Sequence, residues 1–208
     1  MAFEIPLLRD GALPIVIEEI QPGEGGIDLA LVCAEAEKLG MNAWVYDENG
    51  FPSGFVGGAL LEKAENRDRF LTWKQGAFDP AADLHYDLSG THLKLTDTEK
   101  PGVAYLNIYI GTSASTVDIL NPAVVDQFLE ATHEQYKAHF ADAFSEKIQG
   151  FFTDEPQYFR YNTPYTPLVR AYFREHYKTE LFAELGLLFV EKEGYRQFRY
   201  RYWLAMQT

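Results

Sequence analysis

At two places in the chain, an apolar run of residues is followed by a loop of polar or small residues. Residues 27–39 carry apolar side chains at helical spacing and stop at Gly40, a common residue just beyond a helix. Residues 42–47 then form a short apolar run that leads into a loop rich in glycine and proline. Residues 148–152 form a second apolar run, which leads into an acidic loop. This order is typical of parallel α/β folds, in which the loops after the strands carry function.

A further helix is predicted between these two strands. Asn121 is a favourable N-cap, and Pro122 is a favourable first helical residue. Residues 116–120, just before this cap, are predicted to form a third parallel strand in one sheet with residues 42–47 and 148–153. Side chains at helical spacing after the cap are Val125, Phe128, Leu129, Thr132, Tyr136 and Phe140.

The middle of the chain has a different pattern. Residues 103–110 have the alternating pattern of a strand, in which consecutive side chains point to opposite faces. Ser89 and Gly90 lie between two short strand-like runs, and this arrangement predicts a hairpin turn. Residues 68–111 are therefore predicted to be a small antiparallel insertion. Thr166 with Pro167 starts a later helix, and a last helix is predicted from about residue 193.

Composition and charge exclude several kinds of partner. Acidic residues outnumber basic ones, 31 against 18, and the formal net charge of the 208 residues is −13. Clustered lysine and arginine attract nucleic acids and anionic membrane surfaces, so we expect neither as a partner. The single cysteine, Cys33, allows no internal disulfide and no zinc–cysteine site. No apolar run is long enough to span a membrane and no signal peptide is recognisable, so we expect a cytoplasmic protein.

The acidic loop after residues 148–152 holds the strongest candidate for chemistry. Asp154 and Glu155 follow an apolar strand that ends in two phenylalanines, at the position where barrel enzymes hold catalytic groups. A carboxyl group beside aromatic side chains loses solvation, its pKa rises, and it can then serve as a general acid. We therefore predict that Glu155 is the catalytic acid. In the alternative interpretation, Asp154 caps a turn and Glu155 is a solvated surface residue.

The loop after residues 42–47 is the second candidate. Asp47, Glu48 and Asn49 follow that strand directly. Because the loops after parallel strands emerge at the same edge of a sheet, we expect Glu155 to point into a cleft shared with Asp47 or Glu48. The alternative interpretation is an ordinary acidic turn.

Other polar and aromatic residues give weaker signals. Asp118 is a third candidate for the same pocket. Tyr158 follows the acidic loop, and aromatic rings form platforms for the apolar faces of sugars, although large cores use them too. The histidines are scattered and are interpreted as non-catalytic; they are His85, His92, His133, His139 and His176.

Three segments occur in a recognisable order. They are WVYDENGFPSGFVGG, then VDILNP with its following helix, then IQGFFTDEPQY followed by TPYTPLVRAYFREHY. Together they resemble a family of bacterial (β/α)8-barrel glycoside hydrolases allied to the α-L-rhamnosidases. The resemblance covers roughly residues 27–60 and 116–203. The first and third segments are long and fairly specific, whereas VDILNP is weak alone.

The resemblance implies a fold and an activity. The fold is α/β: one partial (β/α)8, TIM-barrel-like domain over residues 1–208, with residues 68–111 as an antiparallel β insertion. The activity is hydrolysis of O-glycosidic bonds in a carbohydrate substrate by carboxylate acid/base catalysis, with Glu155 as the acid after the fourth strand. With the candidates above, the expected substrate-binding residues are Asp47, Glu48, Asn49, Asp118, Asp154 and Tyr158.

The chain also departs from that family. A full barrel takes about 250 residues, a convincing first strand is missing, and the second catalytic carboxylate usually comes from a later strand. Three or four barrel strands leave an open sheet edge, which predicts self-association. No metal site is predicted from the residues, although some relatives use calcium. The alternative functions are a catalytically inactive carbohydrate-binding protein and a structural remnant of a barrel.

Overall fold

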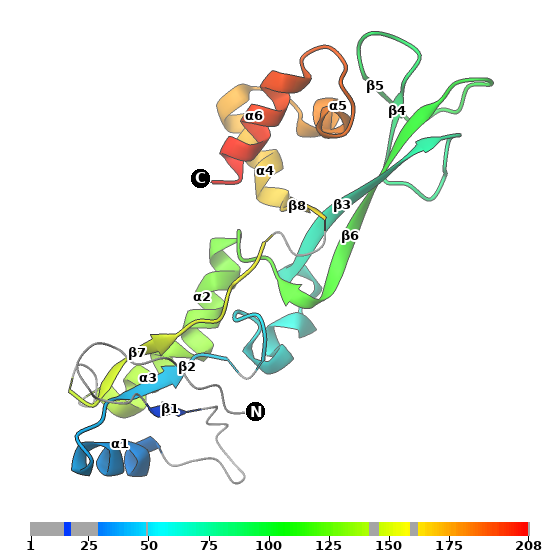
Figure 1. Ribbon diagram of the computed structural model, residues 1–208. Coiled ribbons are helices and arrows are strands. Elements are labelled where there is room, and N and C mark those ends of the chain that lie inside the picture. Colours follow the sequence, from blue (N-terminus) through cyan, green and yellow to red (C-terminus); the bar gives the residue numbers. More distant parts are fainter. Residues whose placement is uncertain (1–14, 18–28, 49, 142–145, 159–161, 208) are drawn as a thin grey trace. The chain divides into compact units, whose positions relative to one another are not determined.

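The structure is a computed structural model in which the chain forms two compact units (Figure 1). The first unit combines Met1–Asn66 with Ser115–Gln157, and the second combines Arg67–Ala114 with Tyr158–Thr208. Each unit is therefore assembled from two separate stretches of sequence. The residues that the structure describes are 15–17, 29–48, 50–141, 146–158 and 162–207.

The first unit contains a parallel sheet of three strands. These are β1 (Ile15–Ile17), β2 (Ala43–Tyr46) and β7 (Ile148–Phe152), in the order β1-β2-β7. Both neighbouring pairs are parallel. The helix α1 (Leu29–Lys38) lies between β1 and β2 in the sequence, as the crossover between parallel strands requires.

Close packing of the sheet depends on one glycine. Gly150 of β7 lies opposite Trp44 of β2. A Cβ atom at Gly150 would come within 2.8 Å of the Trp44 ring, so a larger residue there would displace the indole. Helices α1 and α3 both contribute to the core of this unit. The cluster at the sheet consists of the buried residues Cys33, Ala43, Val45 and Ile148, with Val32, Tyr136, Phe140 and Phe151 packed against them.

Two helices precede β7, α2 (Pro122–Ala131) and α3 (His133–Phe140). The predicted cap is confirmed, because the Asn121 side chain accepts a hydrogen bond from the Ala123 N–H at 3.1 Å. The periodicity predicted one helix, but the structure divides it at Thr132. The Thr132 hydroxyl donates to the carbonyl of Phe128 at 2.7 Å, a local bond that competes with helix continuation.

The second unit contains a sheet in the order β5-β4-β6-β3-β8. The pairs β4–β5, β4–β6 and β3–β8 are antiparallel. Pairing of β4 with β5 confirms the hairpin predicted around Ser89 and Gly90. The strands are β3 (Arg67–Gly76), β4 (Leu84–Asp87), β5 (Lys94–Thr96), β6 (Tyr105–Val117) and β8 (Thr163–Tyr165).

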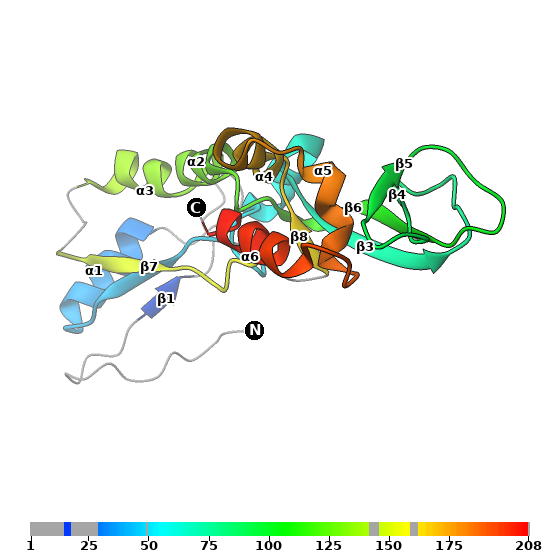
Figure 2. The ribbon, with the colours of Figure 1, turned by 90° about the horizontal axis from the view of Figure 1, so that it is seen from above.

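Helices from the C-terminal stretch complete the second unit. Figure 2 shows α4, α5 and α6 grouped beside β8. Buried tyrosines tie helix and sheet segments together: the Tyr86 hydroxyl donates to the carbonyl of Phe182, and that of Tyr202 donates to the carbonyl of Pro164, both at 2.6 Å. The bounds are α4 (Pro167–Tyr172), a π-helical turn (Phe173–Tyr177), α5 (Leu181–Glu184), a 3₁₀ turn (Leu185–Leu188) and α6 (Tyr195–Ala205).

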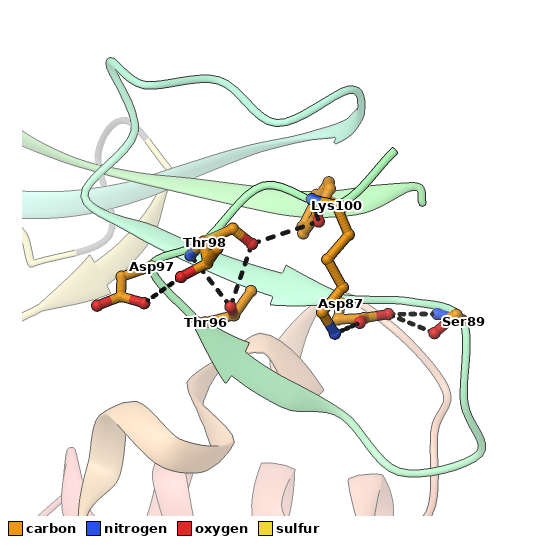
Figure 3. A network of polar contacts seen from close by, with 7 residues as sticks. Asp87, Ser89, Thr96, Asp97, Thr98 and Lys100 are labelled. Atoms are coloured by element: carbon orange, nitrogen blue, oxygen red, sulfur yellow. Dashed lines mark hydrogen bonds and ion pairs between the residues drawn. The ribbon is translucent and has the colours of Figure 1, made fainter. Parts of the chain in front are cut away.

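A polar network fixes the loops at the β4–β5 hairpin (Figure 3). Asp87 accepts hydrogen bonds from the backbone N–H and the hydroxyl of Ser89, at 2.9 and 2.6 Å. Lys100 donates to the other oxygen of Asp87 at 2.9 Å. The Ser89 donors, followed by Lys100, hold the pKa of Asp87 well below its usual range. These contacts give Asp87 a structural role in the loops at the hairpin.

One part of the predicted parallel sheet is wrong. Residues 42–47 and 148–153 do supply adjacent parallel strands, because β2 pairs directly with β7. Residues 116–120 do not join that sheet, since β6 extends through Val117 in the antiparallel sheet. The strand that begins at Tyr105 continues without a break through Val117.

The described chain is a mixed α/β protein with two sheets that are not closed into a barrel. The sequence shows no convincing first strand, but Ile15–Ile17 form β1. Three residues are too few to show the period of a strand, so only pairing with β2 identifies it. The antiparallel pairing predicted within residues 68–111 is confirmed.

Candidate functional site

A pocket of about 320 Å³ lies in the first unit, beside the loops that follow β2 and β7. Its walls are mostly apolar, and its polar side chains are those of Asp47, Ser53, His133 and Thr153. Pockets of this kind, apolar with a few converging polar groups, are the usual form of a ligand site. The other lining residues are Gly54, Val117, Ile119, Val124, Val125, Phe128, Leu129 and Pro156.

Asp47 links the two loops. Its Oδ1 accepts from the Ser53 hydroxyl at 2.7 Å, and its Oδ2 accepts from the Thr153 hydroxyl at 2.6 Å. Ser53 Oγ itself accepts from the Asp154 N–H at 2.8 Å, so the Ser53 hydrogen is directed to Asp47. The Asp47 side chain is fully buried, at 0 % exposed. Asp47 therefore joins the two loops by accepting a hydrogen bond from each.

Glu48 has a different set of partners. Its Oε2 accepts from the backbone N–H groups of Gly54, Phe55 and Val56 at 3.2, 2.9 and 2.7 Å. Its Oε1 accepts from the Gly57 N–H at 2.6 Å. The chain can turn around the carboxylate because Gly54 and Gly57 adopt positive φ angles of 131° and 57°. These glycines therefore enclose a carboxylate of the protein itself.

Asp154 belongs to the same framework. Its Oδ2 accepts from the Tyr46 hydroxyl at 3.0 Å, and its carbonyl accepts from the Ser53 N–H at 2.9 Å. Burial, followed by this hydrogen bond to Asp154, raises the pKa of Tyr46 well above its usual range. Tyr46 thus stays protonated, and its hydroxyl contacts both Asp154 Oδ2 and the Gly50 carbonyl, which is 2.9 Å away.

Glu155 is exposed, so the expected desolvation of its carboxyl group is wrong. Its nearest polar contact is with Gln157, whose Nε2 donates to Oε2 at 3.5 Å. Two near neighbours in sequence, Thr153 and Pro156, line the pocket. Glu155 also has a φ of 39°, a left-handed conformation that is uncommon for a residue with a side chain. The structure thus presents Glu155 to solvent, on a strained backbone, in the loop that lines the pocket.

The remaining predicted residues have separate environments. Asp118 is buried, at 2 % exposed, and its N–H donates to the carbonyl of Asn66 at 2.8 Å. Its neighbours Val117 and Ile119 line the pocket, whereas Asp118 is not among the lining residues described. Tyr158 is 42 % exposed and belongs to the second unit. Asn49 lies outside the described residues.

The sequence did not point to His133, which the structure places on the pocket wall. Its Nε2 is 4.0 Å from Asp47 Oδ2, and its Nδ1 is 2.9 Å from the Thr132 hydroxyl oxygen. Burial lowers the pKa of His133, and the charges of Asp47 and then Glu134 oppose that effect. A signal did exist, because residues four apart share a helix face. Val125, Leu129 and His133 have this spacing, and all three line the pocket.

The candidate carboxylates do not fit a calcium site. Calcium takes six to eight oxygen ligands. Asp47 and Glu48 instead direct their oxygens to hydroxyl and N–H donors of the protein. Within the described ranges, no group of three or more histidine, cysteine or acidic side chains is close enough to hold a metal ion.

Comparison of this chain with protein-family models, curated proteins and solved structures finds no match. The pocket and the three sequence segments are therefore what bears on function. Among the residues that the structure describes, no helix is both long and apolar enough to cross a membrane.

Proposed function

We propose that this chain is a glycoside hydrolase, or the catalytic part of one, with Glu155 as the proton donor. In this proposal the sheet β1-β2-β7 is part of a (β/α)8-type barrel. The loops after β2 and β7 form the edge at which a carbohydrate binds. The observation that supports the proposal is the position of Glu155, exposed in the loop that lines the pocket at the carboxyl end of a parallel strand.

The backbone of Glu155 supports the same proposal. Holding a residue at an unusual φ angle costs about 1–3 kcal/mol, and such residues cluster at active sites and ligand clamps. A φ of 39° at a glutamate has no evident structural benefit among its hydrogen bonds, since its one described polar contact is the 3.5 Å bond from Gln157. We infer that the strain orients the carboxyl group for a bound substrate.

The chemistry needs a second carboxylate, which acts as nucleophile or as base for water. Asp47 is the one acidic residue among those described as lining the pocket, and its oxygens are held by Ser53 and Thr153. Its role in this proposal is to hold the loops in place. Glu155 would protonate the leaving oxygen of the glycosidic bond, with Asp154 keeping the loop against Tyr46.

The test is hydrolysis by the parent and by Glu155→Gln, measured on a panel of oligosaccharides and nitrophenyl glycosides. We expect kcat on oligosaccharides to fall by about 10²–10⁴-fold, the usual share of general acid catalysis. Nitrophenyl glycosides should be affected less, because their leaving group needs little protonation. Gln157→Glu in the Glu155→Gln background is the control for a carboxylate at the wrong position, and it should not restore activity. Equal rates for parent and Glu155→Gln on both substrate classes would refute the acid role.

A second candidate is a carbohydrate-binding protein without catalysis. It is favoured by the engagement of Asp47 and Glu48 with protein donors, which gives both carboxylates a structural role. Calorimetric titration of the same oligosaccharides separates the candidates. Binding by a parent that hydrolyses none of the panel, with affinity retained in Glu155→Gln, would favour the binding protein.

A further inference from the structure

The hydrogen bonds of Thr132 favour one tautomer of His133. The Thr132 hydroxyl has one hydrogen, and it points to the carbonyl of Phe128 at 2.7 Å. Thr132 Oγ1 is then an acceptor for the His133 ring nitrogen at 2.9 Å. This arrangement favours the neutral tautomer with its hydrogen on Nδ1, in which Nε2 has only a lone pair.

That lone pair faces a carboxylate. Nε2 and Asp47 Oδ2 are 4.0 Å apart, which is too far for a hydrogen bond, and both are acceptors when the ring is neutral. The Asp47 side chain is fully buried, so its interaction with the ring is only weakly screened. Adding a proton to Nε2 reverses the interaction, because an imidazolium N–H donates to a carboxylate at about 2.7–2.9 Å.

Aromatic rings and charged side chains from three elements surround His133. From β7, the ring of Phe151 lies 4.3 Å away between centroids, and from α2 the ring of Phe128 lies 5.7 Å away. Neither titrates. On α3 itself, Glu134 favours the charged ring, and Lys137 lines a second hollow together with His133. Asp47, at the end of β2, is the one charged group described within 4.0 Å of a ring nitrogen.

We propose that His133 and Asp47 form a pH-operated latch in the wall of the pocket. Protonated His133 moves onto Asp47 Oδ2, and the neutral ring is held apart from it by the repulsion of two acceptors. The ring is a shared wall of the pocket of about 320 Å³ and of a neighbouring hollow of about 390 Å³. Closing the latch therefore changes the shape of both and places a charge beside apolar walls, so that apolar ligand surfaces bind better to the neutral form.

The latch would regulate the site of the proposed hydrolase, and only that consequence rests on the proposed function. The latch itself is tested on the whole chain without any activity measurement. Nitrogen NMR of histidine-labelled protein follows the rings across pH, and His133→Gln identifies the resonance of His133. The neutral ring of the parent should carry its hydrogen on Nδ1. A neutral ring protonated on Nε2 would overturn the proposal.

Two substitutions test the partner. Asp47→Asn should lower the pKa of His133 by about one unit, the low end of the effect of an opposite charge at this distance. Glu134→Gln is the matched control, since it removes an acid whose side chain is 58 % exposed, and its effect should be smaller because water screens it. An Asp47→Asn effect no larger than that of Glu134→Gln would contradict the latch.

The effect of the latch on the pocket is measured by the binding affinity of xenon, a neutral apolar probe whose own charge does not change with pH. Xenon affinity in the parent should fall as His133 becomes protonated, by about fivefold, the low end of usual couplings between linked sites. In His133→Gln the affinity should not follow that titration. The same pH dependence in both proteins would overturn the proposal. Loss of hydrolysis in Glu155→Gln bears on the proposed function alone, so the two failures are distinguishable.

Discussion

Asp47 and Glu48 are neighbours in the sequence, yet their carboxylates have different kinds of partner. Asp47 accepts from two side-chain hydroxyls, and Glu48 accepts from four backbone N–H groups. Strand alternation explains the difference, because consecutive side chains point to opposite sides at the end of β2. One carboxylate faces the loop after β7, and the other faces the turn formed by its own loop. Both are buried acids whose surroundings supply the donors that burial requires.

The backbone of Glu155 gives a prediction at the same scale. A left-handed conformation costs a residue with a Cβ atom about 1–2 kcal/mol, and glycine adopts it freely. Glu155→Gly should therefore have a free energy of unfolding about 1 kcal/mol above that of Glu155→Ala, measured by urea denaturation. Gln157 is the matched control, because its φ is not positive, and there the alanine variant should be the more stable. An advantage of alanine at both positions would contradict the strain.

Short helical segments of the second unit are joined by one acid. Glu180 precedes α5 and accepts from Arg170 of α4 at 2.7 Å and from Arg174 of the π-helical turn at 2.6 Å. The hydrogen bond from Arg170, ahead of the one from Arg174, lowers the pKa of Glu180 from 4.5 to about 2. Because the folded state holds the charged form, the contribution to stability is complete above the ordinary pKa. It is lost as the pH falls from 4.5 toward 2.

This linkage predicts a pH effect. Glu180→Gln should lower the free energy of unfolding near neutral pH, and the variant should lose less stability than the parent between pH 4.5 and 3. The effect should be modest, because the Glu180 side chain is 38 % exposed and water screens the pair. Urea denaturation at several pH values measures it. Glu175→Gln, which removes an equal charge from an exposed position, should keep the slope of the parent; a shared change of slope would assign the effect to net charge.

At the scale of the whole molecule, each unit draws on two distant stretches of the chain, so neither can fold until both stretches are made. The parallel sheet of the first unit ends at β1 and β7 in the described residues. Edge strands offer backbone donors and acceptors to another chain, which favours association. The net charge of −13 opposes it through repulsion between copies.

The balance of these two effects predicts association that depends on concentration and on salt. Light scattering with size-exclusion chromatography should give a mass that rises with protein concentration. The rise should be larger in about 0.5 M than in 0.05 M sodium chloride, because salt screens the repulsion between acidic surfaces. A single mass of one chain under all these conditions would contradict the expectation of an open edge.

Local signals in the sequence predicted several elements correctly. Asn121 with Pro122 and Thr166 with Pro167 predicted two helix starts, and both caps are present. The apolar runs around residues 42–47 and 148–152 predicted two strands, which are β2 and β7. These features depend on residues within a few positions of one another, so the sequence by itself determines them.

The tertiary structure decided which residues far apart in the sequence contact one another. Thr153 donates to Asp47 across 106 positions, and His133 faces Asp47 from a helix that carries no catalytic motif. Burial of Asp47, exposure of Glu155 and the extension of β6 through Val117 also arise from contacts distant in sequence. A carboxylate followed by glycines has the same local pattern whether it binds a ligand or, like Glu48, its own backbone. Only the folded chain distinguishes the two, because the donors that solvate a buried charge are brought to it by packing.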